Sequence, residues 1–385
     1  MSDAGHTQLT WNLMTDDAIT AADREALAEF VRTSSRLTQG AVVKRFEGAW
    51  SRWLGCKYSV YVNSGSSANL LIVRALSDPY LKETWVTQAC TWATTVSPIM
   101  QFANLQLCDI SLENFSPDLK NLEHIFKTQK PKFLLLTHLL GFVALSDPLL
   151  ELCDKYGVVL VEDCCEAHGA EFGGKKVGTH GLASSFSFYY GHHMTTIEGG
   201  MICTDDEKLY HELLQLRSHG MLRTLPQKFR SEHQVDNVDP SFTFLRDGFN
   251  VRNTDFHAVL GLRQLSRLDD CIAHRNKNYE TFVDELDPTK YKVDFIKDGC
   301  SNFALPIFVK NANTEAAKEK MRELNIEYRP CVAGNLYQHP FMEAVNQFRF
   351  DKNAQEAHQK CMYVGNHKDV TPQMVKILCE ALNSL

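Results

Sequence analysis

The chain has 385 residues, of which 44% are hydrophobic and 23% are charged. These proportions exclude a disordered or collagen-like chain and are typical of a globular protein with a substantial core. The net charge of −7, with acidic and basic residues interspersed, gives no electrostatic basis for binding nucleic acid or an anionic membrane. No apolar run reaches the roughly 18 residues of a membrane span, and the first residues lack a signal-peptide pattern, so we expect a cytoplasmic protein.

Short apolar segments alternate with helical patterns through the first two thirds of the chain. The predicted strands cover residues 58–62, 105–108, 133–137, 158–161 and 184–188. This alternation predicts an α/β fold with a mostly parallel sheet and helices on both faces. In such sheets, ligands bind at the carboxyl ends of the strands, and each motif described below falls at such an end.

The pattern changes after residue 265. Helices are predicted over 269–285, 314–324 and 372–382, with a strand over 302–309. We interpret this part as a smaller α+β domain. The predicted domains are therefore a large domain over residues 1–265, which includes the N-terminal segment, and a small C-terminal domain over residues 266–385.

A serine-rich segment at residues 64–67 lies between the predicted strand 58–62 and a helical pattern over 70–76. Free backbone amides at a helix start, a permissive glycine and small hydroxyl groups form an anion cradle suited to a phosphate. The alternative is an ordinary serine cap, which many helices have.

Acidic residues follow the apolar strand at 158–161. Asp163 is the candidate carboxylate here, because a carboxylate at a strand end can pair with the protonated nitrogen of a pyridine ring. The alternative is a helix cap or a surface acid. Trp92 is a candidate for stacking on such a ring, although a lone tryptophan more often belongs to the core. The cysteines include no Cys-x-x-Cys pair, so we expect no metal site.

The third motif surrounds His192, with Ser-Phe at 187–188 before it and Glu-Gly-Gly at 198–200 after it. The motif resembles a pyridoxal phosphate site in which a lysine holds the cofactor as a Schiff base, but no lysine lies between Lys176 and Lys208. An imidazole cannot form that imine, although with an ordinary pKa of about 6.5 it can move protons at neutral pH. We therefore expect noncovalent pyridoxal phosphate, with pyridoxamine phosphate as an alternative resting form.

Together these motifs resemble the sugar aminotransferase family often called DegT/DnrJ/EryC1/StrS, and the resemblance covers nearly the whole chain. They occur in the family's order at 64–68, 162–163, 187–188, 198–200 and 248–252. The resemblance implies the aspartate aminotransferase type I fold of pyridoxal phosphate enzymes. It also implies a homodimer whose active sites are built from both subunits.

The resemblance assigns cofactor contacts by position. Asp163 would meet the pyridine nitrogen, and Trp92 would stack on the ring. The phosphate would be bound by Gly65, Ser66 and Ser187, with Asn250 reaching it from the partner subunit.

Two departures from the family pattern concern the chemistry directly. His192 stands where the family has lysine, and Glu166 stands where many relatives have glutamine. A small branch of the family shares this histidine, and His192 is the expected proton carrier. His193 is a rival base or a packed neighbour of His192. His219 and Arg329 are candidate substrate contacts, and the alternative for Arg329 is a salt bridge at the domain junction.

Two activities are associated with that branch, and both use L-glutamate to convert pyridoxal phosphate to pyridoxamine phosphate before a keto sugar binds. The residues at 191–201 are closer to the aminotransferase that forms 8-amino-3,8-dideoxy-octulosonate for lipopolysaccharide, so we predict that activity first. The alternative is a 3-dehydratase of a nucleotide-linked 4-keto-6-deoxyhexose such as GDP-4-keto-6-deoxymannose. A third reading is a catalytically silent partner subunit that has kept the fold.

Overall fold

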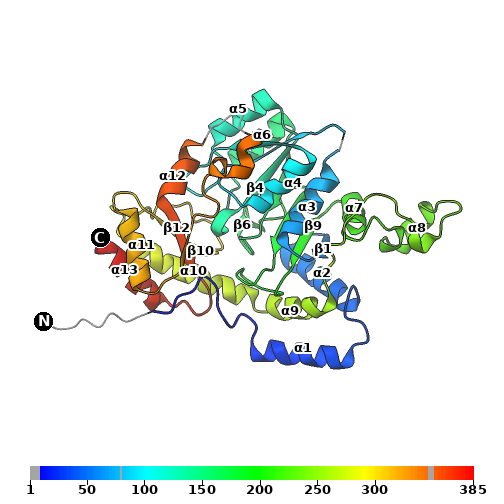
Figure 1. Cartoon of the computed structure of the whole chain (residues 1–385), viewed down its shortest axis with the longest axis horizontal. Coiled ribbons are helices and arrows are strands. Elements are labelled where there is room, and N and C mark those ends of the chain that lie inside the picture. The colour runs from blue at the N-terminus through cyan, green and yellow to red at the C-terminus, as the bar shows by residue number, and fades with distance from the viewer. Residues whose placement is uncertain (1–8, 79, 346–350) are drawn as a thin grey trace.

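The computed structural model describes residues 9–78, 80–345 and 351–385. A seven-stranded sheet forms the centre of its larger part (Figure 1). Only β9 runs against the other strands of this sheet, because it pairs antiparallel with both of its neighbours. The mostly parallel sheet predicted from the sequence is thus confirmed. In spatial order its strands are β1 (Tyr58–Val62), β9 (Gly200–Thr204), β8 (Ala183–Ser187), β5 (Val159–Asp163), β4 (Phe133–Thr137), β2 (Thr84–Gln88) and β3 (Asn104–Cys108).

Alternate residues of the central strands pack against helices on opposite faces of this sheet. On β4, Leu134 and Leu136 join one apolar cluster, whereas Leu135 joins another. Burial on both faces explains why these strands read as continuous apolar runs. The first face is covered by α2 (Ala41–Leu54), α5 (Leu119–Gln129), α6 (Asp147–Tyr156) and α9 (Asp255–Leu265), and the second by α3 (Gly65–Leu76), α4 (Ala93–Phe102) and α7 (Glu207–Arg217).

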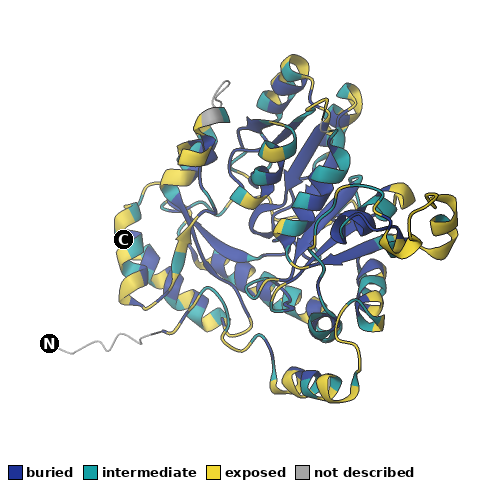
Figure 2. Ribbon diagram, turned by 45° about the vertical axis from the view of Figure 1, so that its right-hand side comes forward, coloured by how far each residue is buried: buried dark blue, intermediate teal, exposed yellow. Residues whose placement is uncertain are grey.

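A second, three-stranded antiparallel sheet is formed by the C-terminal part of the chain. Its strands, in spatial order, are β10 (Ala304–Phe308), β12 (Cys361–Gly365) and β11 (Tyr328–Pro330). The helices of this part are α10 (Leu268–Glu285), α11 (Thr314–Glu323), α12 (Lys352–Lys360) and α13 (Pro372–Asn383). Figure 2 shows that residues of both sheets are mostly buried, while exposed residues lie on the outer faces of the helices.

The N-terminal segment packs against this C-terminal part. Leu9 and the fully buried Trp11 belong to the same apolar cluster as the second sheet, and Trp11 Nε1 donates a hydrogen bond of 2.8 Å to the carbonyl of Gly365. The predicted boundary after residue 265 assigned this segment to the large domain, and that boundary stays a prediction.

Smaller elements complete the described chain. They are α1 (Ala21–Thr33), α8 (Gln227–Glu232), the hairpin of β6 (Glu171–Phe172) and β7 (Lys175–Lys176), and short 3₁₀ helices at Leu139–Gly141, Leu222–Thr224, Pro240–Phe242, Leu336–Gln338 and Pro340–Val345. Within the described ranges, no helix is long and apolar enough to cross a membrane.

The contact between α2 and α9 allows a test of this packing. A Cβ atom added to Gly261 would lie 2.5 Å from the ring of the buried Phe46. We therefore expect Gly261→Ala to lower the free energy of unfolding by about 1–3 kcal/mol in a urea titration. Gly48→Ala, in α2, is the control. A Cβ there meets only the end of a flexible arginine at 3.5 Å, and the change should raise helix stability by up to about 1 kcal/mol. Equal effects of the two changes would contradict this packing.

Candidate active site

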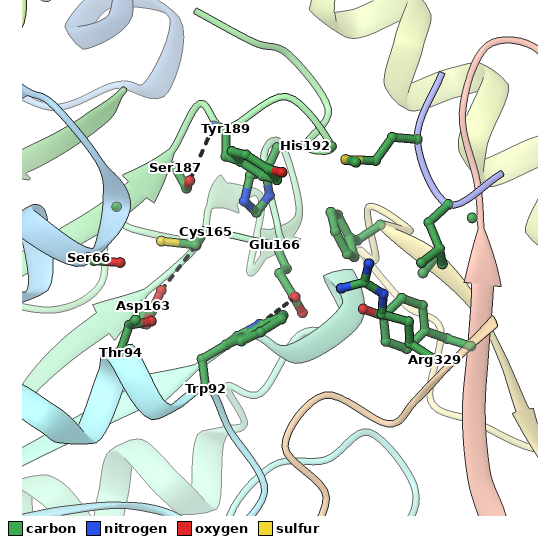
Figure 3. Close-up of a pocket in the computed structure, with 18 of the residues that line it drawn as sticks. Ser66, Trp92, Thr94, Asp163, Cys165, Glu166, Ser187, Tyr189, His192 and Arg329 are labelled. Carbon is green, nitrogen blue, oxygen red and sulfur yellow. Dashed lines mark hydrogen bonds between the residues drawn. The ribbon is translucent and has the colours of Figure 1, made fainter. Parts of the chain in front are cut away.

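A cavity of about 390 Å³ lies beside the carboxyl ends of β5 and β8, at the start of α3. Figure 3 shows side chains from both sheets and from the connecting loops pointing into it. Eight of the residues predicted from the sequence line this cavity: Gly65, Ser66, Trp92, Asp163, Glu166, Ser187, His192 and Arg329.

The start of α3 forms one wall. Ser64 caps the helix by accepting a hydrogen bond of 3.0 Å from the Ser67 amide, and the amides of Gly65 and Ser66 have no carbonyl in the helix to which they can donate. A Cβ atom on Gly65 would lie 2.7 Å from Cβ of Ser187. Only glycine therefore lets the helix start approach β8 this closely. The result is a group of free amides beside small hydroxyls, which can hold a phosphate.

Asp163 ends β5 and is held by three hydrogen bonds. Its Oδ2 accepts from Asn69 Nδ2 at 2.8 Å and from Thr95 Oγ1 at 2.9 Å, and its Oδ1 accepts from the Cys165 amide at 3.2 Å. The side chain is 3% exposed yet lines the cavity. This fixed carboxylate can pair with a cationic nitrogen in a planar ring.

Trp92 and Glu166 form a second wall. Glu166 accepts a hydrogen bond of 2.7 Å from Trp92 Nε1 with one oxygen and a hydrogen bond of 2.7 Å from the Leu140 amide with the other. Because the two donors meet different oxygens, a glutamine in the same position would turn its NH₂ group toward one of them. Burial, and more weakly the charge of Asp163, raise the pKa of Glu166 to about 7. The departure from the family's glutamine thus fixes the indole of Trp92, which remains 38% exposed.

His192 lies on the loop between β8 and β9, and its imidazole is half-buried. The ring lies 5.2 Å from the ring of Phe303 and 6.0 Å from the ring of His168, and Nδ1 has no hydrogen-bond partner within the described chain. Burial, with a smaller contribution from the charge of Arg275, lowers the pKa of His192 to about 3. The imidazole is therefore neutral at physiological pH, although the same burial makes it a weaker base than an exposed histidine.

Arg329 reaches the cavity from β11 with a largely exposed side chain. Its nearest carboxylate is that of Glu327 at 3.7 Å, and both side chains are about half exposed, so this ion pair contributes little. The guanidinium remains available to an anionic ligand.

Three predicted residues do not line this cavity. His193 is buried, with Nε2 3.2 Å from the carbonyl of Ser301, and it lines a different cavity. His219 has a φ of +63° and donates its amide to Phe249 at 2.7 Å. Asn250 is exposed, and its contact with a partner subunit stays a prediction.

The structure adds residues that sequence reasoning missed. Asn69 and Thr95, which hold Asp163, lie within three residues of the predicted Ser66 and Trp92, so their position in the sequence is a usable signal. Phe303, just before β10, and Tyr363, in β12, also line the cavity, more than one hundred residues after His192. No local motif marks them, because only the fold brings them to the site.

Comparisons with known proteins identify the family of this chain. The model of the DegT/DnrJ/EryC1/StrS aminotransferase family matches residues 17–383. The chain belongs to this family. Among its curated members, GDP-4-keto-6-deoxy-D-mannose 3-dehydratase of Escherichia coli O55:H7 is 34% identical over 88% of this chain and 91% of the relative. The protein of the same name from Yersinia pseudotuberculosis is 33% identical, over 91% of this chain and 92% of the relative. A lipopolysaccharide biosynthesis protein of Salmonella typhimurium is 29% identical over 80% of this chain and 76% of the relative.

Solved structures of family members confirm the predicted fold. GDP-4-keto-6-deoxy-D-mannose-3-dehydratase of E. coli, with bound hydrated PLP, superposes with a TM-score of 0.90 at 30% identity, over 97% of this chain and 100% of that one. A structure of GDP-4-keto-6-deoxymannose-3-dehydratase with a trapped PLP-glutamate geminal diamine gives a TM-score of 0.88 at 30% identity, with the same coverage. The α/β fold that the resemblance implied is therefore shared across almost the whole chain.

Buried histidines make stability depend on pH. Burial lowers the pKa values of His168, His192 and His193 below their ordinary value, so below about pH 6.5 the unfolded chain takes up protons that the folded chain does not. Each histidine then lowers the free energy of unfolding by up to about 1.4 kcal/mol per pH unit. Glu166, whose pKa is raised, acts in the opposite direction as a single group. We expect a net loss of stability between pH 7 and pH 5 in urea titrations.

His192→Asn should make this pH dependence shallower, because it removes one of the histidines whose pKa is lowered by burial. His233→Asn is the control, since that histidine is exposed. An unchanged slope in His192→Asn would mean that the His192 imidazole takes up its proton equally in the folded and unfolded chain.

Proposed function

We propose that this enzyme is a pyridoxamine phosphate-dependent 3-dehydratase of a nucleotide-linked 4-keto-6-deoxyhexose, with L-glutamate as the amino donor. The observation that carries the proposal is His192 at the lysine position of the family, in a cavity lined by eight predicted site residues, together with two relatives of 33–34% identity that are named as such dehydratases. GDP-4-keto-6-deoxymannose is the proposed substrate. These relatives favour the 3-dehydratase, our alternative prediction, over the octulosonate aminotransferase, which is our first prediction from the sequence. They give that aminotransferase no support.

Pyridoxal 5′-phosphate and its amine form fit the residues of the cavity. The free amides of Gly65 and Ser66, with the Ser187 hydroxyl, would hold the phosphate, and the fixed carboxylate of Asp163 would hold the pyridine nitrogen in its protonated form. The indole of Trp92 would stack on the ring. When bound, the cofactor supplies an amino group for the sugar carbonyl and an electron sink for the carbon that loses its hydroxyl.

His192 moves the proton in this proposal. Its neutral ring accepts a proton inside the cavity, and the same imidazole, once protonated, can assist the departure of the sugar hydroxyl. Within the described chain no lysine lines the cavity, so no protein amine competes for the cofactor aldehyde. Without such an amine, the protein cannot form an imine with the cofactor, and loss of the sugar hydroxyl is favoured.

The remaining contacts concern the substrates and the partner subunit. Arg329 would bind an anionic group, either the carboxylate of L-glutamate or a phosphate of the sugar nucleotide. His219 and Asn250 lie outside the cavity of their own chain, which suits contacts to the site of a second subunit in a homodimer. The relative named for lipopolysaccharide biosynthesis supports a place in the synthesis of a surface sugar.

Labelled L-glutamate separates the candidate reactions. We expect the enzyme, given pyridoxal phosphate, ¹⁵N-labelled L-glutamate and GDP-4-keto-6-deoxymannose, to form a sugar that has lost a hydroxyl and to release labelled ammonia, both measured by mass spectrometry. Label retained in a sugar, including the 8-oxo octulosonate offered in parallel, would instead establish an aminotransferase. A silent partner subunit would give neither product and would leave the absorbance of the bound cofactor unchanged when L-glutamate is added.

Replacing His192 tests the proton carrier. His192→Asn should lower kcat by about 10²–10⁴-fold, because an amide cannot accept the proton, while cofactor absorbance and secondary structure are retained. His233→Asn, which changes an exposed histidine, should keep the wild-type rate. Wild-type turnover in His192→Asn would remove this residue from the mechanism.

A further inference from the structure

The first cavity, which is the candidate active site, has two dissimilar halves. Figure 3 shows Ser66 and Asp163 on one side of it and Arg329 on the other, with His192 between them. The half around Ser66 and Asp163 is the one that fits the cofactor. The other half is lined by residues of the second sheet and of the N-terminal segment, so it is the half left for the sugar.

The second sheet gives the sugar half an apolar end and a polar end. Ala304 on β10 pairs with Gly365 on β12, and Arg329 on β11 pairs with Tyr363 on β12. All four residues line the cavity. Positions two residues apart on a strand lie on the same face, about 7 Å apart. The guanidinium and the phenol therefore begin about 7 Å away from the end formed by Ala304 and Gly365, which offers no polar side chain.

The N-terminal segment covers the apolar end. Trp11 is fully buried, and Leu13, two residues later, donates its amide to Glu327 at 3.0 Å. A Cβ atom on Gly365 would lie 2.6 Å from the carbonyl oxygen of Leu13, so only glycine lets the segment pass this close to β12. These contacts fix Leu13 and the following Met14, which both line the cavity.

Two apolar side chains of this end lie beside His192. Cγ and Sδ of Met14 lie 3.0 Å from the position that a Cβ atom on Gly191 would take, so the thioether packs against the residue before His192. The ring of Phe303, which precedes β10, lies 5.2 Å from the His192 ring. Met14 and Phe303 are half-buried and line the cavity, so part of each is accessible to a ligand.

The proposed substrate carries an apolar group close to the carbon that reacts. In a 4-keto-6-deoxyhexose, the carbonyl carbon C4 lies between C3, which loses its hydroxyl, and C5, which bears the C6 methyl group. The methyl group is thus only two bonds from C4. When C4 is held within reach of His192, a neighbour of His192 must therefore receive the methyl group.

We propose that Met14 and Phe303 form the pocket for this C6 methyl group and select a 6-deoxy sugar against a sugar with a 6-hydroxyl. The inference rests on the proposed function and names the part of the substrate that the sugar half recognises. A 6-hydroxyl in this pocket would lose its hydrogen bonds to water without gaining a partner. A hydrophobic pocket of this kind discriminates against an added hydroxyl by up to about 100-fold.

Two sugar nucleotides that cannot react test the pocket. GDP-6-deoxymannose and GDP-mannose differ only at C6, and each has a hydroxyl in place of the 4-keto group. We expect the enzyme loaded with pyridoxamine phosphate to bind GDP-6-deoxymannose about 10–100-fold more tightly in calorimetric titrations. Equal binding, or tighter binding of GDP-mannose, would overturn the methyl pocket and leave the proposed function standing. No binding of either nucleotide would contradict the proposed function, and this inference with it.

Variants locate the methyl pocket. Met14→Gln keeps nearly the same size but adds an amide that can pair with a 6-hydroxyl, so it should bring the two affinities to within about threefold of each other. Met374→Gln is the matched control, because Met374 on α13 is also half-buried but does not line the first cavity, and it should keep the wild-type preference. An unchanged preference in Met14→Gln would contradict the pocket.

A crystal of the loaded wild-type enzyme with GDP-6-deoxymannose gives a second measurement that needs no variant. We expect C6 within about 4.5 Å of the side chains of Met14 and Phe303. Density that places C6 against other residues would refute the pocket, even if Met14→Gln failed to fold.

Discussion

The site depends on how closely the start of α3 approaches the ends of β8 and β9. A Cβ atom on Gly200 would lie 2.3 Å from the backbone of Ser64, and one on Gly65 would lie 2.7 Å from Ser187. Two glycines, one on the helix and one on β9, therefore allow backbone to meet backbone. Since β9 pairs with both β1 and β8, this contact also fixes where the loop between β8 and β9 begins and ends. The phosphate cradle, Asp163 and His192 are brought together by that one close approach.

Within this frame, burial shifts the pKa values of Glu166 and His192. Asp163 receives three hydrogen bonds that stabilise its carboxylate. Burial raises the pKa of Glu166 to about 7 and lowers that of His192 to about 3. A hydrogen-bonded aspartate, a glutamate with a raised pKa and an imidazole with a lowered pKa thus share one cavity. Such a set is typical of a site that moves protons, because groups with separated pKa values can act as acid and base at one pH.

Sequence reasoning could predict the elements and residues that local patterns encode. The predicted strands 58–62 and 133–137 match β1 and β4, because these apolar runs are bounded by polar residues. It missed β2, which is half polar, and β9, whose first residue was assigned to a glycine motif. The residues of the first cavity that come from the large sheet were found by motif. Trp11 and Arg275 were not, because their contacts join segments far apart in the chain and depend on how the two sheets pack.

The chemical effect of having histidine instead of lysine at position 192 depends on the residues that surround it. A lysine at this position would place an amine in the cavity, where it would compete for the cofactor aldehyde. An ordinary exposed histidine would be partly protonated near its pKa of about 6.5, and the protonated fraction could not accept a proton. Burial against Phe303 and the charge of Arg275 instead keep the imidazole neutral, while the Arg275 contact to the His192 carbonyl fixes the loop. The same arginine thus contributes both to the neutral state of His192 and to the position of its loop.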